Sequence, residues 1–326
     1  MVYFKEALMQ CRTLFAGLML LTSLCAGASA AQPVRPAMSL VQAIDTLQDG
    51  TRTVAQKLEA CQAIVGLGAE GKTAVPALKA ALKSDAAELR TAAATALHAI
   101  GPGAADALWV LMDNFQNDTV AEPRHEAGTA LLSIGAVDEK QIPVLCGILK
   151  KHADAQVRMQ AGLILSKWGA SQSPRATDAI PDLIVALRDA DAGIRGASLL
   201  AVSSFGVRAS AAITQVTDIA KNDPEPQCKT MAIGVLNQYN DATDPFCGSF
   251  SNQQVSLAQH RTFDEYSLTL TMNGQTYTGT ARLAGNSLNG SFTANGKPSA
   301  FTATLKNDSM TFVTGGTTYQ LGKKRS

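Results

Sequence analysis

The sequence predicts an α-solenoid of six helical pairs followed by a small all-β domain, in a chain of 326 residues. Three observations lead to this prediction. A basic residue recurs at a nearly fixed interval, a glycine or asparagine follows each one eleven residues later, and the composition changes abruptly near residue 241. Hydrophobic residues make up 46% of the chain but aromatic residues only 5%, which favours closely packed, Ala-rich helices over a large β-sandwich.

The recurring basic residues mark the second helix of each pair, at intervals of 33, 34, 34, 37 and 34 residues. They are Lys57, Arg90, Arg124, Arg158, Arg195 and Lys229. A small residue three positions later and a large aliphatic residue seven positions later share one helix face, which is expected to be the buried one. The residues eleven positions later, expected to end each helix in a left-handed conformation, are Gly68, Gly101, Gly135, Gly169, Gly206 and Asn240.

The first helix of several pairs has its own start signal. Pro76, Pro143 and Pro181 follow an aliphatic residue, and proline is tolerated in the first helical turn because its missing N–H would be unpaired there. Ser39 followed by Gln42 predicts a capping box at the start of the array. Acidic residues expected to open second helices, where they complement the positive helix end, are Asp85, Asp154, Asp191 and Asp223.

Residues 85–90, 154–158 and 191–195 share a pattern of Asp, two or three intervening residues, an aliphatic residue and Arg. This pattern resembles the short HEAT-like repeats also found in phycobilisome lyases, and the resemblance covers residues 39–241. It implies a superhelical array that serves as a binding surface. We interpret the recurring basic residues as structural ties between neighbouring repeats through the Asp residues; the alternative is a basic stripe that binds a ligand.

The first thirty residues predict a secretory signal peptide. Lys5 and Arg12 form its positive flank, Leu14–Leu24 its apolar run, and residues 28–30 a small-x-small cleavage site, with residues 31–38 as a short leader. We therefore expect an exported protein, periplasmic or secreted, with no other membrane span. An uncleaved anchor or lipidation at Cys25 are the alternatives.

The charge and the cysteines of the chain after residue 30 exclude two further classes. It has 26 basic and 26 acidic residues. Residues 31–245 carry 19 basic and 23 acidic residues, and residues 246–326 carry 7 basic and 3 acidic residues. This distribution is not typical of a nucleic-acid-binding protein. Without a CxxC pair or a Cys/His cluster, no metal site is expected. Cys228 and Cys247 are a candidate disulfide, and the alternative is that these residues, with Cys61 and Cys146, are small buried apolar residues.

Residues 248–326, after a linker at 242–247, predict six to eight short antiparallel strands closed or nearly closed into a barrel or sandwich. Alternating segments such as 266–271 and 301–305 are separated by turn signals at Asn273-Gly274 and Gly315-Gly316. Aromatic residues expected to line its core are Phe250, Tyr266, Tyr277, Phe292, Phe301, Phe312 and Tyr319. The alternative places some of them on a face that binds a glycan or an apolar ligand.

One segment calls for comparison with an enzyme family. Residues 124–131 resemble the His-Glu motif of deoxyhypusine hydroxylases, HEAT-repeat di-iron enzymes in which several repeats carry the pair. Here only His125-Glu126 has it, so a di-iron site cannot be assembled. A bilin lyase is the other enzymatic alternative. We expect no catalytic residues, no metal and no cofactor.

The function predicted from the sequence is a non-enzymatic scaffold of the bacterial cell envelope that binds a protein or peptide on the concave face formed by the second helices. The alternative is ligand or glycan binding by the β domain, with the solenoid as a spacer. Residues predicted to be exposed in the groove are Glu59, Thr91, His125, Glu126, Met159 and Gln160.

Overall fold

The computed structural model describes residues 38–135, 138–169, 174–263, 265–294 and 296–324. The predicted signal peptide and all but the last residue of the predicted leader lie outside these ranges. The chain divides into two compact units, one that extends to Ala201 and one that begins at Val202. We describe each unit by itself.

The helical array has the six predicted pairs. Its helices are α2 (Leu40–Gln48) with α3 (Val54–Leu67), α4 (Val75–Ala81) with α5 (Ala87–Ile100), α6 (Leu108–Asn117) with α7 (Ala121–Ile134), α8 (Ile142–Lys151) with α9 (Ala155–Gly169), α10 (Ile180–Ala186) with α11 (Ala192–Phe205), and α12 (Ile213–Asn222) with α13 (Pro226–Thr243). Short 3-10 helices join the pairs: η2 (Gly68–Ala74), η3 (Gly101–Ala107), η4 (Glu139–Gln141), η5 (Pro174–Ala179) and η6 (Gly206–Ala212).

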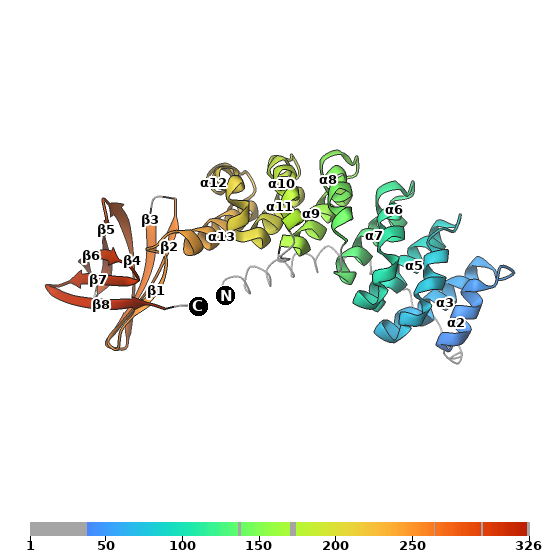
Figure 1. Ribbon diagram of the computed structural model, residues 1–326, viewed down its shortest axis with the longest axis horizontal. Coiled ribbons are helices and arrows are strands. Elements are labelled where there is room, and N and C mark those ends of the chain that lie inside the picture. The colour runs from blue at the N-terminus through green and yellow to red at the C-terminus, as the bar shows by residue number, and fades with distance from the viewer. Residues whose placement is uncertain (1–37, 136–137, 170–173, 264, 295, 325–326) are drawn as a thin grey trace. The chain divides into compact units, whose positions relative to one another are not determined.

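In the first unit, α3 packs against α5, α5 against α7, and α7 against α9. The second helices thus form one layer, with α6, α8 and α10 on the other side (Figure 1). The small residues predicted on the buried face, Ala60, Ala93, Ala127 and Ala161, are all fully buried. Their short side chains let adjacent helices approach closely, and Ile64, Leu97, Leu131 and Leu165 fill the space beside them.

Most helix boundaries follow the predicted signals, although α9 includes Gly169 as its last residue. Gly68, Gly101, Gly135 and Gly206 follow the last residue of a second helix with φ between 55° and 66°, a region that L-residues with a Cβ avoid. α4, α8 and α10 begin one residue before Pro76, Pro143 and Pro181. At the start of the array, Ser39 and Gln42 form the predicted capping box, each side chain bonded to the other's backbone N–H.

One described stretch, Ala192–Asn222, is long and apolar enough to cross a membrane by length and composition. It consists of α11, η6 and α12, and it is interrupted at Gly206, where φ is 55°. Half of its most apolar window is buried inside the protein. Packing within the helical array therefore accounts for its hydropathy.

The C-terminal part is a closed barrel of eight antiparallel strands, each paired with its sequence neighbour, with β1 also paired to β8. The strands are β1 (Gly248–Ser251), β2 (Val255–Thr262), β3 (Glu265–Met272), β4 (Gln275–Ala284), β5 (Ser287–Ala294), β6 (Lys297–Lys306), β7 (Ser309–Thr314) and β8 (Thr317–Lys323). Asn273 and Gly274 both have positive φ, as a two-residue type I′ hairpin requires.

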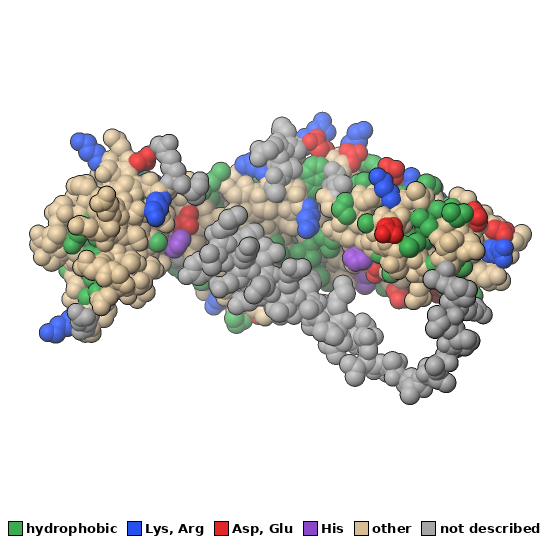
Figure 2. Space-filling view, turned by 90° about the horizontal axis from the view of Figure 1, so that it is seen from below, with side chains coloured by type: hydrophobic (Ala, Val, Ile, Leu, Met, Phe, Trp, Pro, Cys, Tyr) green, Lys and Arg blue, Asp and Glu red, His purple; other side chains and the backbone are tan. Residues whose placement is uncertain are grey.

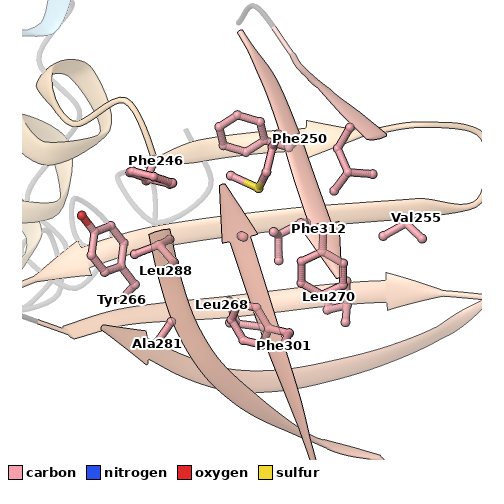
Figure 3. Close-up of a cluster of buried hydrophobic side chains, with 14 of the residues drawn as sticks. Phe246, Phe250, Val255, Tyr266, Leu268, Leu270, Ala281, Leu288, Phe301 and Phe312 are labelled. Atoms are coloured by element: carbon pink, nitrogen blue, oxygen red, sulfur yellow. The ribbon is translucent and has the colours of Figure 1, made fainter. Parts of the chain in front are cut away.

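The barrel interior is filled by side chains (Figure 3). Of the seven aromatic residues predicted to line the core, Phe250, Tyr266, Phe292, Phe301 and Phe312 are buried. Tyr277 and Tyr319 are partly buried and pack against the same cluster. The prediction that the aromatic residues form a core is therefore confirmed.

The last second helix differs from the others, because it continues past the position where they end. Asn240 was expected to terminate it, but α13 runs on to Thr243 and is 18 residues long. Asparagine tolerates a helical conformation, and here the Asn240 side chain donates to the carbonyl of Arg261 in β2 at 2.6 Å. The prediction for Asn240 is wrong because a barrel strand, and not another helical pair, meets this helix end.

The predicted linker at 242–247 is an ordered connection within the second unit. The Asp244 side chain caps the turn by accepting from the Phe246 N–H, and it also accepts from the Arg261 guanidinium at 3.0 Å and the Tyr266 hydroxyl at 2.7 Å. The buried Gln259 amide donates to the Phe246 carbonyl. These contacts join the end of α13 to β2 and β3.

Cys228 and Cys247 are both buried thiols in the structure, so the disulfide considered from the sequence is not formed. Cys61 and Cys146 are buried as well. Burial raises the pKa of the thiols of Cys61, Cys146 and Cys247 to about 12. They therefore pack as small apolar side chains, as the alternative interpretation predicted.

Candidate binding face on the second helices

The recurring arginines form a series of ties between successive repeats. Arg90 in α5 grips Asp118 through two bonds, from Nε to Oδ2 at 2.7 Å and from Nη2 to Oδ1 at 2.8 Å. Arg158 in α9 pairs with Asp189 in the same way but more loosely, with 3.4 Å between Nε and Oδ2. Each arginine thus reaches the loop that opens the next second helix.

The same side chains also hold their own loops. Nη1 of each arginine donates to a backbone carbonyl six residues earlier: Ser84 for Arg90, Asp118 for Arg124, His152 for Arg158 and Asp189 for Arg195. Lys57 and Lys229 occupy the equivalent positions in α3 and α13. The arginines are therefore structural, as predicted, and do not form a free basic stripe.

The acidic partners differ in part from those expected. Asp154 accepts Arg124 of the preceding repeat, whereas Arg90 and Arg158 reach Asp118 and Asp189, which the sequence had not singled out. Asp191 opens α11 as expected, because its Oδ1 accepts from the Ile194 N–H. Asp118 and Asp189 each lie two residues before the residue that precedes the helix. Each carboxylate also accepts the backbone N–H of that residue, Val120 for Asp118 and Asp191 for Asp189. That turn fixes each carboxylate where the preceding arginine can reach it.

The tie between α7 and α9 has a third member. Asp154 Oδ2 accepts from Arg124 Nη2 at 2.9 Å and lies 2.5 Å from His125 Nε2. Because His125 occupies part of the carboxylate, Arg124 cannot make the two-bond fork that Arg90 makes. Its buried Nε has no hydrogen-bond partner among the described residues.

Asp154 is the electrostatic centre of this cluster. Partial burial acts to raise its pKa, but hydrogen bonds from Arg124 and His125 outweigh burial and hold the pKa well below its usual range. Its second oxygen, Oδ1, accepts from the Gln156 N–H at 2.9 Å and so opens α9. The carboxylate therefore fixes both the start of α9 and the orientation of the His125 ring on α7.

Gln160 corrects one of the site predictions. It was expected to be exposed, but only 5% of its surface is accessible. Its amide donates to the carbonyl of His125 at 3.0 Å and to the hydroxyl of Thr129 at 3.2 Å, and thus crosses from α9 to α7. Gly128 makes room for it, because a Cβ there would stand 2.6 Å from Gln160 Oε1. Gln160 is a packing residue.

The other five predicted residues lie on the second helices as expected, with different exposure. Glu59 on α3 is exposed, whereas Thr91 on α5, His125 and Glu126 on α7, and Met159 on α9 are half-buried. The Thr91 hydroxyl donates to the Ala87 carbonyl of its own helix. Since the four helices are packed in series, these positions belong to one layer of the first unit.

The exposed side of this layer is chemically mixed. Its visible part in Figure 2 combines hydrophobic patches with acidic, basic and histidine side chains. Among the described residues no group of three or more His, Cys, Asp or Glu side chains is placed to hold a metal ion. The accessible surface of this layer therefore offers apolar groups and charged groups of both signs.

The comparisons with known proteins agree with the helical architecture. A sequence model of HEAT repeats matches residues 40–132 and 142–237, more than half of the chain. The match ends before the barrel. Among curated proteins, none matches the chain.

Several solved structures are similar to the helical part. A designed armadillo repeat protein in complex with the peptide (KR)4 has a TM-score of 0.50 at 15% identity, over 62% of this chain and 99% of its own. An engineered protein has a TM-score of 0.49 at 18% identity, over 62% and 96%. The complex of CpcE and CpcF of phycocyanin lyase from Nostoc sp. PCC7120 has a TM-score of 0.39 at 20% identity, over 50% and 98%.

At 15% identity the designed armadillo repeat structure indicates a similar fold and nothing about activity. The evidence for the family is the HEAT model match together with six helical pairs whose arginines and helix-ending glycines keep the repeat interval. The chain belongs to the HEAT repeat family.

Proposed function

We propose that the protein is an exported, non-enzymatic scaffold of the bacterial cell envelope that binds a protein or peptide on the exposed side of its second helices. The observation that supports this most is that some side chains of those helices hold the repeats together while others remain accessible to a partner. The arginines and Gln160 are used in ties between repeats, while Glu59, Glu126 and Met159 lie in the same layer with accessible surface. Export is inferred from residues 1–30 of the sequence alone.

The chemistry of these positions favours a polypeptide partner. A half-buried Met offers a soft, adaptable apolar contact, and nearby acidic side chains offer contacts to basic or amide groups. The similar designed armadillo protein is complexed with a basic peptide, which makes peptide binding a known use of this kind of fold. Residues 31–245 carry 19 basic and 23 acidic residues, a net charge of −4, which favours a neutral or basic partner.

The test uses paired variants on opposite sides of the array. Glu126→Ala combined with Met159→Ala removes two half-buried side chains of the second-helix layer, whereas Trp109→Ala combined with Gln116→Ala removes two exposed side chains of α6. After crosslinking in the native envelope, we expect the first pair to lose at least about tenfold of the captured partner, as hot-spot truncation typically does, and the second to retain it. The reverse result would move the binding surface to the first helices.

A second candidate, ligand binding by the barrel, has less support, because the hollow of about 100 Å³ lined by Ser249, Ser256 and Lys324 is small for a sugar ring. All seven aromatic residues belong to the barrel core or pack against it. Five of the seven are buried, and the two that are partly accessible, Tyr277 and Tyr319, pack against the core and do not form an open stacking platform for a sugar ring. A titration of the isolated chain with envelope glycans that moved signals of residues 248–324 would restore this candidate.

A further inference from the structure

The contact between the last helix and the barrel contains a titratable pair. α13 extends about one turn beyond the length of the other second helices, and this turn carries Asn240 and Asp241. The Asn240 amide donates to the Arg261 carbonyl in β2, and the strand residue before it, His260, lies beside Asp241. The extension of α13 therefore brings a carboxylate to a histidine that lies 19 residues later in the sequence.

Both carboxylate oxygens of Asp241 lie within hydrogen-bond distance of the same nitrogen of His260. His260 Nδ1 lies 2.8 Å from Asp241 Oδ1 and 2.9 Å from Oδ2. The side chains are 38% and 35% exposed, so water and protons reach them. A protonated imidazole donates to a full negative charge here, whereas a neutral imidazole offers only an ordinary hydrogen bond.

The charged groups near the pair within the described residues are engaged elsewhere. On β2, Arg261 donates to Asp244 of the helix cap, which also accepts the Tyr266 hydroxyl of β3. From α12, Lys221 lies over the Phe263 ring at 4.8 Å. Glu265 at the start of β3 is directed to Arg282 of β4 at 4.0 Å, and Lys323 of β8 donates to the Pro245 carbonyl. Asp241 is thus the carboxylate that His260 contacts.

We propose that His260 and Asp241 form a pH-dependent latch, which holds the barrel on the last helix while the imidazole is charged and weakens when it loses its proton. Arg261–Asp244 and Asn240 persist at all physiological pH values, so the barrel remains attached and only the tightness of this contact changes. The latch acts on the extra turn of α13 and the end of β2.

The direction of the pH dependence follows from the pair. The hydrogen bond to Asp241, opposed by partial burial, raises the pKa of His260 above its ordinary value. A raised pKa in the folded state means that the contribution is complete below the unfolded value, about 6.5, and is lost as pH rises through the folded value. The latch is therefore closed in mildly acidic solution and open in mildly alkaline solution.

Hydrogen exchange on the full chain measures the latch directly. We expect the amides of residues 239–243, corrected for intrinsic exchange, to be about two- to fivefold more protected at pH 5.5 than at pH 8.5, the range for an exposed ion pair. His260→Gln and Asp241→Asn should each abolish this difference, and His98→Gln, which changes an exposed histidine on α5, should leave it intact.

A second readout identifies the titrating group. The NMR titration of the His260 ring should give a pKa above that of an unperturbed histidine, and Asp241→Asn should bring it down. An unchanged pKa in Asp241→Asn, or a pH dependence of protection that survives in His260→Gln, would overturn the latch. Because both variants keep the Arg261–Asp244 pair and the Asn240 hydrogen bond, we expect them to fold. If one of them does not fold, the His260 ring is titrated in the unaltered chain at high salt instead, and screening of Asp241 should lower the pKa of His260.

Discussion

Nε2 of His125 on α7 lies 2.5 Å from Oδ2 of Asp154, the residue that opens α9, and the same oxygen also accepts a hydrogen bond from Arg124. Two side chains of one repeat thus compete for a single acceptor in the next. This arrangement distinguishes the central tie from the two-bond pair of Arg90 and Asp118. It also fixes the His125 ring at the layer that we propose as the binding face.

This competition predicts that removing Arg124 and removing His125 lower the free energy of unfolding by different amounts. In Arg124→Ala, partly buried Asp154 loses its permanent cation, which we expect to lower the free energy of unfolding by about 3 kcal/mol. In His125→Ala, Arg124 still neutralises Asp154, so the loss should be about 1 kcal/mol, the worth of one hydrogen bond. Urea unfolding of both variants checks this, and equal losses would show that Arg124 does not dominate the tie.

The fork of Arg90 predicts a difference between buried and exposed pairs. Arg90→Ala should lower the free energy of unfolding by about 3 kcal/mol, because it leaves the Asp118 carboxylate, whose side chain is 4% exposed, without its cation. Arg90→Lys should recover part of this, since lysine keeps the charge but cannot make two parallel bonds. Arg52→Ala is the matched control: its pair with Asp49 lies at the surface, so unfolding should change little. A large loss in the control would contradict this ranking.

Gly128 predicts a steric effect on the α7–α9 contact. A Cβ there would lie 2.6 Å from Gln160 Oε1 and 2.7 Å from the Phe115 ring. We expect Gly128→Ala to destabilise by about 1–3 kcal/mol, as overpacking does. Gly147→Ala in α8, where nothing lies within 4 Å of the added Cβ, should instead stabilise by about 0.5–1 kcal/mol through helix propensity.

A double-mutant cycle separates this steric effect from the helix propensity. If Gln160 is the neighbour that must move, Gln160→Ala should reduce the further cost of Gly128→Ala, with an interaction energy above about 0.5 kcal/mol. Strict additivity of the two substitutions would place the strain on Phe115 alone.

Acid should loosen the ties of the array. Burial acts to raise the pKa values of Asp118 and Asp154, but hydrogen bonds from their arginine partners, backbone N–H bonds and charge attraction together lower them in the folded state. A lowered pKa means that the stabilisation is complete above the unfolded value, about 3.9, and is lost as pH falls below it. Unfolding followed by circular dichroism should show this loss below about pH 4. Asp118→Asn should be less stable at neutral pH and less sensitive to acid, and an unchanged acid profile would contradict this assignment.

Much of the architecture was predictable from local signals. Helix-ending glycines, prolines in first turns and the Ser39–Gln42 box depend on residues within a few positions of one another. The alternation and turn residues of the C-terminal part likewise predicted hairpins, although not closure into eight strands. The recurring arginines were correctly interpreted as structural because they repeat at the interval of the helices.

The errors concern contacts between elements. The sequence did not single out Asp118 and Asp189 as the acceptors of Arg90 and Arg158, because the register between neighbouring repeats decides which loop carboxylate is within reach. Gln160 is buried because Gly128 leaves space on the adjacent helix, which no pattern within α9 reveals. Asn240 matched the series of helix ends, yet the barrel strand beside it gives its amide a different partner.

The most direct test of the proposed function is crosslinking of the protein in its native envelope, followed by mass spectrometry that maps the crosslinked residues. Our account predicts one dominant protein partner, crosslinked within residues 57–232 through second-helix positions such as those around Glu126 and Met159. Crosslinks confined to the barrel, residues 248–324, would contradict it and would make the solenoid a spacer.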